Sequence, residues 1–329
     1  MKKVLVTGVA GFIGFHLAER LLADGYTVVG IDNLNDYYDV RIKERRLKIL
    51  KGFPKFSFRK LDISDYEAFE EFLRKEKPKD IVHLAAQAGV RYSLTNPWAY
   101  ATANYVGTLN VFEAAKRLKF PRVIYASSSS VYGTNKKSPF SESDRVDTPM
   151  SLYAASKKAN EALAYSYHHL YGMEMIGLRF FTVYGRWGRP DLALFKFARR
   201  IQAGKPIDVY NHGKMKRSFT HVSDITAAIA TLLTQKPSGR YKLYNLGGSE
   251  VVSLLGFVKL IEKNLGKKAK IRMLPIQPGD VPATVADTSA AKRDLGYVAK
   301  TKVEEGIADF IEWFREEQTF LATLEEPKQ

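Results

Sequence analysis

Residues 1–180 alternate between two patterns of apolar side chains. Short runs rich in β-branched residues are separated by longer stretches in which apolar residues recur every three or four positions. The first pattern predicts strands and the second predicts amphipathic helices. The predicted strands are Val4–Thr7, Thr27–Asp32, Phe56–Leu61, Asp80–Leu84, Val123–Ser127 and Met175–Phe180. The predicted helices are Ile13–Leu22, Tyr66–Lys75, Trp98–Leu118 and Leu152–Leu170. Strands that alternate with helices over this length indicate a doubly wound parallel sheet.

The pattern changes after Gly185, where glycine, proline and arginine punctuate Arg186–Pro190. We expect Thr220–Leu233 and Tyr244–Gly248 to return to the sheet. Further helices are predicted over Leu192–Gln202, Val252–Leu265 and Val303–Arg315. The expected fold is therefore α/β, with a doubly wound parallel (Rossmann) sheet and a smaller α/β lobe. The first domain would span residues 1–183 with return segments at about 219–248, and the lobe residues 184–218 and 249–329.

Composition narrows the class of protein. The 329 residues include no cysteine, which rules out disulfides and fits a reducing compartment. The N-terminal apolar run is too short for a signal peptide, and no stretch approaches the roughly 20 apolar residues of a membrane helix. We expect a cytoplasmic protein without a membrane partner.

The net charge of +16 has two interpretations, an anionic partner such as nucleic acid or a lysine-rich solvated surface. Basic residues are spread along the chain, as in Lys43–Arg46, Lys136-Lys137 and Lys267-Lys268. This spread favours the solvated surface, and no nucleic-acid partner is expected. A small anionic substrate would benefit from the field in either case.

A glycine motif, Gly8-Val9-Ala10-Gly11-Phe12-Ile13-Gly14, lies between the first strand and the first helix. Glycines there allow a tight turn, close approach of a pyrophosphate and close helix–strand packing. The helix N-terminus offers unpaired N–H groups to the phosphates. A plain tight turn is the alternative, but the strand before the motif and the helix after it favour a dinucleotide site.

The second strand ends at Asp32, whose carboxylate can accept hydrogen bonds from ribose hydroxyls and would repel a 2′-phosphate. Asn33 follows it, and no arginine does. These residues predict NAD in preference to NADP. A capping role for Asp32 is the alternative.

Tyr153 and Lys157 are four positions apart early in a predicted helix, so they share one face. A free phenol has a pKa of about 10, and a neighbouring positive charge lowers it. The pair is a candidate general base, although this spacing also arises by chance on helix surfaces. Ser127–Ser130 follow the fifth strand, at the sheet edge where α/β proteins bind ligands, and are expected to line a polar pocket.

Together with the segment Leu84-Ala85-Ala86, the serine-rich Ser128–Gly133 and the segment Arg179–Gly185, these motifs resemble the extended short-chain dehydrogenases/reductases that modify nucleotide sugars. The similarity covers essentially the whole chain. Three longer motifs resemble the UDP-glucuronate 4-epimerases within that family. They are Gln87-Ala88-Gly89-Val90-Arg91-Tyr92-Ser93, Gly188-Arg189-Pro190-Asp191 and Gln277-Pro278-Gly279-Asp280-Val281-Pro282.

The resemblance implies an NAD-dependent isomerase that converts UDP-glucuronate to UDP-galacturonate. Tyr153 would take the proton of the sugar 4-hydroxyl, Ser128 would position it, and the C4 hydride would pass to NAD. The 4-keto sugar would then turn over and take the hydride back on its other face. NAD is regenerated in each cycle, so it would stay tightly bound. The expected cofactor residues are Gly8, Gly11, Phe12, Ile13, Gly14, Asp32, Asn33, Asp62, Ile63, Leu84, Ala85, Ala86, Tyr153 and Lys157.

The positions after Ser128 indicate which reaction to expect. The family's 4,6-dehydratases have an Asp-Glu pair where Ser129 and Ser130 stand, and its UDP-glucuronate decarboxylases have a glutamate at the second position. Without these carboxylates, elimination is not expected. Ser129, Ser130, Thr182 and the cation of Arg189 are expected to hold a uronate carboxylate. UDP-glucose epimerases usually have asparagine in place of Thr182.

Two more arginines, Arg91 and Arg217, are assigned to the substrate, Arg217 by its match to a phosphate-binding arginine of the family. The chain departs from the family pattern at Arg186, Ser218 and Gln277. The histidines have no metal-ligand spacing, so we expect no metal and structural roles for His83, His168, His169 and His221.

The resemblance also implies a homodimer in which Trp98–Leu118 and Leu152–Leu170 form a four-helix bundle. Two alternatives stay open. One is a UDP-glucose or UDP-N-acetylglucosamine 4-epimerase, and the other is a non-catalytic protein that binds a dinucleotide or RNA.

Overall fold

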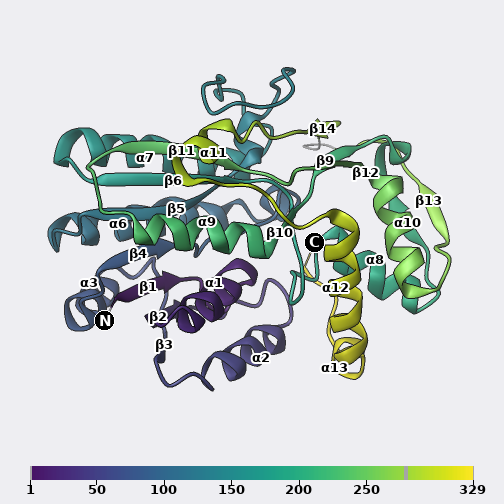
Figure 1. Ribbon diagram of the computed structural model, residues 1–329, viewed down its shortest axis with the longest axis horizontal. Helices are drawn as coiled ribbons and strands as arrows, with labels where there is room; N and C mark the ends of the chain where they lie inside the picture. Colours follow the sequence, from purple (N-terminus) through teal and green to yellow (C-terminus); the bar gives the residue numbers. More distant parts are fainter. Residues whose placement is uncertain (1, 278–280, 329) are drawn as a thin grey trace.

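The computed structural model describes residues 2–277 and 281–328 and is built around a seven-stranded sheet (Figure 1). The strand order is β11-β6-β5-β4-β1-β2-β3, and each of its neighbouring pairs is parallel. The order reverses between β1 and β4, which is where doubly wound sheets bind ligands. The strands are β1 Lys3–Thr7, β2 Thr27–Asp32, β3 Phe56–Lys60, β4 Asp80–His83, β5 Arg122–Ser128, β6 Glu174–Phe180 and β11 Tyr241–Leu246. All six predicted strands are confirmed.

Helices cover both faces of this sheet because successive side chains of a strand point to opposite sides. In β1, Val4 and Val6 join one buried cluster and Leu5 joins the other. The first cluster includes residues of α1 (Phe12–Ala23), α2 (Val40–Leu50) and α9 (Val222–Thr234). The second includes residues of α3 (Tyr66–Glu76), α6 (Gly107–Arg117) and α7 (Leu152–Tyr171).

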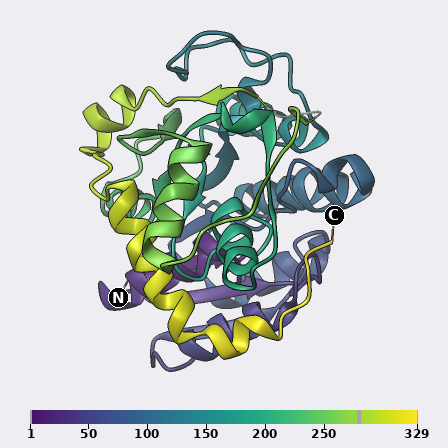
Figure 2. The ribbon, with the colours of Figure 1, turned by 90° about the vertical axis from the view of Figure 1, so that its right-hand side faces the viewer.

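The second lobe lies at one end of the sheet and is built from helices and short strands (Figure 1). Its elements are β7 Val183–Tyr184, α8 Ala193–Gln202, β8 Ile207–Val209, the 3-10 turn η3 Tyr210–Gly213, β9 Lys216–Ser218, β10 Thr220–His221, β12 Val251–Ser253, α10 Leu254–Leu265, β13 Ile271–Met273, β14 Ala283–Thr284, α12 Val303–Glu316 and α13 Gln318–Ala322. One further helix, α11 (Ser289–Leu295), packs on β11 and α9. Figure 2 shows α12 and α13 running from this lobe toward the N-terminal part of the chain, where Glu317 pairs with Arg45 of α2 at 2.8 Å.

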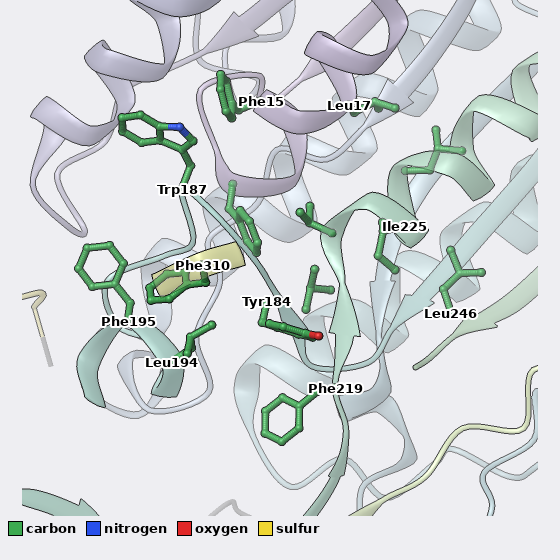
Figure 3. Close-up of a cluster of buried hydrophobic side chains, with 14 of the residues drawn as sticks. Phe15, Leu17, Tyr184, Trp187, Leu194, Phe195, Phe219, Ile225, Leu246 and Phe310 are labelled. Carbon is green, nitrogen blue, oxygen red and sulfur yellow. The ribbon is translucent and has the colours of Figure 1, made fainter. Parts of the chain in front are cut away.

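A buried aromatic cluster attaches the lobe to the sheet domain (Figure 3). The Trp187 ring lies 6.1 Å from Phe15 of α1 and 5.0 Å from Trp313 of α12. Phe195 of α8 packs on Phe310 of α12 at 6.2 Å. Since this cluster joins residues from both parts, the two share one hydrophobic core. Within the described ranges, no helix is long and apolar enough to cross a membrane.

The expectation that Thr220–Leu233 returns to the sheet is wrong. Only β10, at Thr220–His221, is extended, and it pairs with β7 outside the large sheet. The rest is α9, in which Ile225, Ile229 and Leu232 recur at helical spacing and are buried. Of the two predicted return segments, only Tyr244–Gly248 enters the large sheet, because its first residues form the end of β11.

The helix α2 was not predicted, and its basic residues were interpreted as part of a solvated surface. That interpretation is wrong for Lys43 and Arg46, which are 5% and 0% exposed. They share a buried face with Ile42, Leu47 and Leu50, whereas Arg45 points outward. The charges in this run obscured an amphipathic helix.

The predicted helix Trp98–Leu118 is interrupted in its first half. It begins as α5 (Pro97–Tyr100), after the single turn α4 (Tyr92–Thr95), continues as a π-helical segment at Ala101–Val106, and becomes α6. The buried Asn104 amide exchanges hydrogen bonds of 2.7 and 2.9 Å with the Gln87 backbone and donates to Ser156 at 2.9 Å. Such π-bulges are frequent at functional sites.

A buried polar network lies beneath the carboxyl ends of β5 and β6. Arg179 of β6 forms two hydrogen bonds of 2.8 and 2.9 Å with Glu161 of α7. Glu161 also accepts a 2.7 Å bond from Ser127, and Arg179 donates to Tyr132 at 3.0 Å. The network fixes the end of β5 against α7.

We predict that Arg179→Met lowers the free energy of unfolding by about 3–5 kcal/mol, because it leaves the buried carboxylate of Glu161 without its cation. Urea denaturation followed by circular dichroism measures this loss. Arg145→Met is the matched control, because Arg145 pairs with Asp147 on the surface. Equal stability of the Arg179 variant and the wild type would contradict the assigned role of the ion pair.

Candidate active site

One cavity of about 470 Å³ lies at the carboxyl ends of the central strands. It brings together the three predicted catalytic residues, every predicted cofactor residue and five of the seven predicted substrate residues. The predicted residues that line it are Gly8, Gly11, Phe12, Ile13, Gly14, Asp32, Asn33, Asp62, Ile63, Leu84, Ala85, Ala86, Ser128, Ser129, Ser130, Tyr153, Lys157, Thr182 and Arg189.

The glycine loop lies so close to its neighbours that side chains do not fit. A Cβ on Gly14 would lie 2.1 Å from the carbonyl oxygen of Gly8, and one on Gly8 would lie 2.8 Å from Ala85 Cα. Gly8 also has a φ of +71°, which favours glycine. The close packing brings the N-terminus of α1, with its free N–H groups, to the cavity.

Asp32 is held at the end of β2, beside the glycine loop. Its carboxylate accepts hydrogen bonds from the Leu34 N–H at 2.8 Å and the Ala10 N–H at 3.2 Å. Two lone-pair directions stay available for ribose hydroxyls. Asp62 accepts a 2.8 Å bond from Asn33. Burial opposes ionisation of Asp62, but the bonds from Asn33 and Ser64 outweigh it and lower its pKa.

These features fit NAD. The cradle between Gly8 and Gly14 is one that any Cβ would fill, the helix N-terminus suits a pyrophosphate, and the Asp32 carboxylate suits an unphosphorylated ribose.

Tyr153 and Lys157 both face the cavity from α7. The Lys157 ammonium donates to the carbonyl oxygen of Ala126 at 3.0 Å, and burial lowers its pKa to about 8. Burial raises the pKa of the Tyr153 phenol, while a hydrogen bond with Ser128 and the charge of Arg189 act in the opposite direction. The charge of Arg189, which was assigned to the substrate, therefore also favours the Tyr153 phenolate.

The serines follow β5 in the 3-10 turn η2, Ser129–Tyr132. Ser128 Oγ donates to Ser130 Oγ and accepts from the Ser130 N–H, both at 3.2 Å. The hydroxyl of Ser128 is thus oriented between the turn and Tyr153. Ser129, Ser130 and Thr182 add further hydroxyls to the cavity wall.

Arg189 reaches the cavity from the loop after β7. Its Nε and Nη2 donate to the two oxygens of Asp191 at 2.9 and 2.5 Å. Tyr37 donates to the same carboxylate at 3.2 Å. Although burial opposes its charge, the Asp191 carboxylate raises the pKa of Arg189. The guanidinium therefore stays charged and faces Tyr153.

Arg91 and Arg217 do not line this cavity. The Arg91 guanidinium lies 4.8 Å from the centre of the Tyr210 ring, and Arg217 donates to the carbonyl oxygens of Lys216 and Pro282 at 2.9 and 3.3 Å. Both lie toward the second lobe, and their assignment to the substrate stays a prediction. Part of the motif at 277–282, namely 278–280, lies outside the described residues.

Arg186 is one of the positions at which the chain differs from the family pattern, and its side chain binds α12. Arg186 forms ion pairs with Asp309 at 2.7 Å and Glu312 at 2.6 Å, both on α12. The loop that carries Arg189 is thereby tied to α12.

The predicted site residues omit several polar residues that line the cavity. Among them are Tyr37, Tyr38, Lys43 and Gln87, and Lys43 Nζ lies 3.8 Å from Asp32. Nearness to Asp32 in the chain was the signal that could have found the first three, but only the fold shows that α2 turns Lys43 inward.

His83 is a buried part of the sheet. It forms hydrogen bonds with Thr7 at 2.8 Å and Thr108 at 3.1 Å, and burial together with the Lys157 charge lowers its pKa to about 3. It is therefore neutral and structural. Over the described ranges, no group of three histidine, aspartate or glutamate side chains is placed to bind a metal ion.

A parallel doubly wound sheet, a glycine cradle beside an aspartate at the end of the second strand, and a Ser–Tyr–Lys set in one cavity define an NAD-dependent enzyme of the extended short-chain dehydrogenase/reductase class. More narrowly, the chain belongs to the family described as GDP-mannose 4,6-dehydratase, whose profile matches residues 5–310.

Several relatives resemble it along nearly their whole length. A probable UDP-glucuronate 4-epimerase of Rhizobium meliloti is 45% identical over 95% of this chain and 96% of its own. The UDP-glucuronate 4-epimerase of Thermodesulfobacterium geofontis is 44% identical over 95% and 96%. The crystal structure of UDP-glucuronic acid 4-epimerase from Bacillus cereus with UDP-glucuronic acid and NAD matches with a TM-score of 0.90, at 32% identity over 95% and 99%.

We predict that Gly14→Ala abolishes NAD retention, because its methyl group would lie 2.1 Å from the Gly8 carbonyl oxygen. Chromatography of the nucleotide released from denatured protein measures the NAD content. Gly256→Ala is the control, because Gly256 holds the same position in the first turn of α10 and its nearest neighbour is the side-chain oxygen of Ser253 at 3.1 Å. A Gly14 variant that retains NAD would refute the assignment of the cradle.

Proposed function

We propose that this protein converts UDP-glucuronate to UDP-galacturonate by epimerisation at C4. The observation that carries the proposal is the position of Arg189, a partly buried cation that lines the same cavity as Ser129, Ser130, Thr182 and the base Tyr153, and whose charge lowers the pKa of that tyrosine. Such a set suits a carboxylate on the sugar that Tyr153 deprotonates. The named UDP-glucuronate 4-epimerases to which the chain is similar support the same reaction.

The family name mentions dehydration, but the residues near Tyr153 do not suit it. Elimination of water needs an acid and a base beside the sugar. Among the described lining residues, the only carboxylates are Asp32 and Asp62, at the cofactor end of the cavity. Ser129 and Ser130 stand where the dehydratases have their acidic pair. Epimerisation needs only one proton acceptor, which Tyr153 supplies.

In the proposed cycle, Tyr153 accepts the proton of the sugar 4-hydroxyl, and Ser128 orients that hydroxyl through its contact with the phenol. Bound NAD supplies reversible hydride exchange at C4. Arg189 stabilises the phenolate until Tyr153 returns the proton to the inverted sugar. Lys157, fixed to Ala126, lies next to Tyr153 on α7 and would bind the nicotinamide ribose.

A 4-keto uronate is a β-keto acid and can lose carbon dioxide. Loss is slow when the bond from C5 to the carboxyl carbon lies near the plane of the ketone. Arg189 is held rigidly by Asp191 and can therefore fix the carboxylate direction, while Ser129, Ser130 and Thr182 donate to its oxygens. The same set thus binds the substrate and suppresses the side reaction.

We propose a homodimer that associates through α5–α6 and α7. These helices pack side by side and expose large apolar side chains, with Trp98 78% and Leu170 65% accessible. Large exposed apolar side chains that gather on adjacent helices are typical of an interface between protein chains. Analytical ultracentrifugation at micromolar concentration tests the proposal, and a monomer would contradict it.

We propose that the chain is divided into two parts. Residues 1–183 and about 219–248 form an NAD-binding domain, and residues 184–218 and 249–329 form a lobe that binds the UDP-sugar. The packing of α8, α10 and α12 on one another supports this division, although α11 packs on the sheet domain.

We also propose that the protein acts in the cytoplasm. The absence of cysteine from the sequence fits this reducing compartment.

A proton NMR time course of the purified protein with UDP-glucuronate and no added cofactor tests the function. The expected result is UDP-galacturonate without pentose products, and the Tyr153→Phe variant should retain NAD and lose about 10²–10⁴-fold in rate. Tyr165→Phe, an exposed residue of the same helix, is the control. Turnover of UDP-glucose but not of UDP-glucuronate would overturn the proposal in favour of a neutral-sugar epimerase.

For Arg189→Gln we predict a KM for UDP-glucuronate that is higher by about 10- to 100-fold, the usual effect of losing charge-assisted hydrogen bonds. Because the Arg189 charge lowers the pKa of Tyr153, its removal raises that pKa and shifts the acidic limb of the kcat profile to higher pH. Arg189→Lys keeps the charge, so it should raise KM and leave the profile in place. Identical pH profiles for wild type and Arg189→Gln would contradict this role.

A further inference from the structure

Arg46 is a fully buried cation outside the catalytic set. It lies on α2 with 0% of its surface exposed. The described residues include no carboxylate that forms an ion pair with it, and its Nε has no hydrogen-bond partner among them. A charge buried without a carboxylate is costly. Packing alone does not explain an arginine here, since an apolar side chain would fill the same space.

Its two terminal nitrogens connect two loops that are far apart in the sequence. Nη1 donates to the carbonyl oxygen of Ala10, in the glycine loop, at 2.7 Å and to the Tyr38 hydroxyl at 2.9 Å. Nη2 donates to the carbonyl oxygen of Trp187 at 2.6 Å, with a longer contact to Gly188 at 3.5 Å. One planar guanidinium therefore sets the distance between the cofactor loop and the loop that carries Arg189.

The loop that carries Arg189 has a backbone conformation that must be held in place by its neighbours. Trp187 has a φ of +53°, a left-handed conformation that is rare for a bulky residue and persists only where its surroundings impose it. Its ring is fixed between Phe15 and Trp313, as Figure 3 shows for Phe15. Its carbonyl is fixed by Arg46. The peptide that leads to Arg189 is thus held from both sides.

We propose that Arg46 is a positioning residue that couples the cofactor loop to Arg189 and so to recognition of the substrate carboxylate. This inference rests on the proposed function. Arg46 acts through the Trp187–Gly188 peptide and does not line the cavity. Lysine cannot replace it, because a single nitrogen cannot donate to both carbonyl groups at the spacing of a guanidinium.

The test compares Arg46→Lys with Arg45→Lys in the holoenzyme. Arg45 is the neighbouring residue on α2, pairs with Glu317 on the surface and contacts neither loop. Arg46→Lys is expected to raise KM for UDP-glucuronate by about 10- to 100-fold through misplacement of Arg189, with kcat within about threefold. NAD content and the affinity for UDP, which has no carboxylate, should not change. Arg45→Lys should match the wild type throughout.

Two further measurements separate positioning from a general effect on the fold. In the Arg189→Gln background, Arg46→Lys should add no further rise in KM, because the residue through which it acts is gone. Hydrogen exchange of holoenzyme amides at 185–192 should be faster in Arg46→Lys, with α7 unchanged. This readout needs no sugar, so it decides the structural coupling even if the wild type does not act on UDP-glucuronate.

Unchanged KM together with unchanged exchange at 185–192 would overturn the proposal. So would parallel losses of NAD, UDP affinity and melting temperature, because they indicate a merely structural role. If Arg46→Lys does not fold, Tyr38→Phe removes one acceptor of Arg46 and should produce a smaller change in the same exchange signal; no change there would also overturn it. A wild type inactive on UDP-glucuronate with the exchange difference present would refute only the proposed function.

Discussion

The close contact between the glycine loop and its neighbours is the constraint on which the rest of this structure depends. Because Gly14 and Gly8 approach to a distance that excludes a Cβ, the turn from β1 into α1 is tight and spans only residues 8–11. The N-terminal N–H groups of α1 then face the cavity, and Asp32 can bind the Ala10 N–H from the next strand. The same loop presents the Ala10 carbonyl to Arg46, and through it the loop of Arg189 is placed. In the proposed function, one backbone contact therefore supports both cofactor binding and substrate recognition.

Burial and the neighbouring side chains shift the pKa of the Tyr153 phenol in opposite directions. Burial raises the pKa of the phenol, so a buried tyrosine is a poor base without a nearby cation. Arg189 supplies that cation and is kept charged by Asp191, whereas Lys157 is anchored on the Ala126 carbonyl and has a lowered pKa. In the proposed reaction, a cation that also holds the substrate carboxylate would link substrate binding to activation of the base. The buried pair of Glu161 and Arg179 fixes the end of β5, the strand that carries Ser128.

Local sequence patterns predicted much of the fold and part of the candidate site. The six strands, the glycine cradle, Asp32, and the Tyr153–Lys157 pair depend on contacts within a few residues or on spacing along one element, so the sequence predicted them. The errors have a common cause. Thr220–Leu233 is apolar enough for a buried strand, but its buried residues recur at helical spacing and pack on α1 as α9. Lys43 and Arg46 are charged, and only the burial of α2 turns them into interior residues.

By itself the sequence determined the class of fold and predicted the cofactor end of the cavity and a candidate base, because apolar periodicity, backbone-restricted glycines and spacing along one helix are local features. The tertiary structure decided which charges meet. That the Arg189 charge acts on Tyr153, that Tyr37 donates to Asp191, and that Arg46 joins the loops at 10 and 187 depend on residues distant in the chain. Electrostatic and hydrogen-bond energies depend on distance in space and on burial, and neither is defined until the chain has folded.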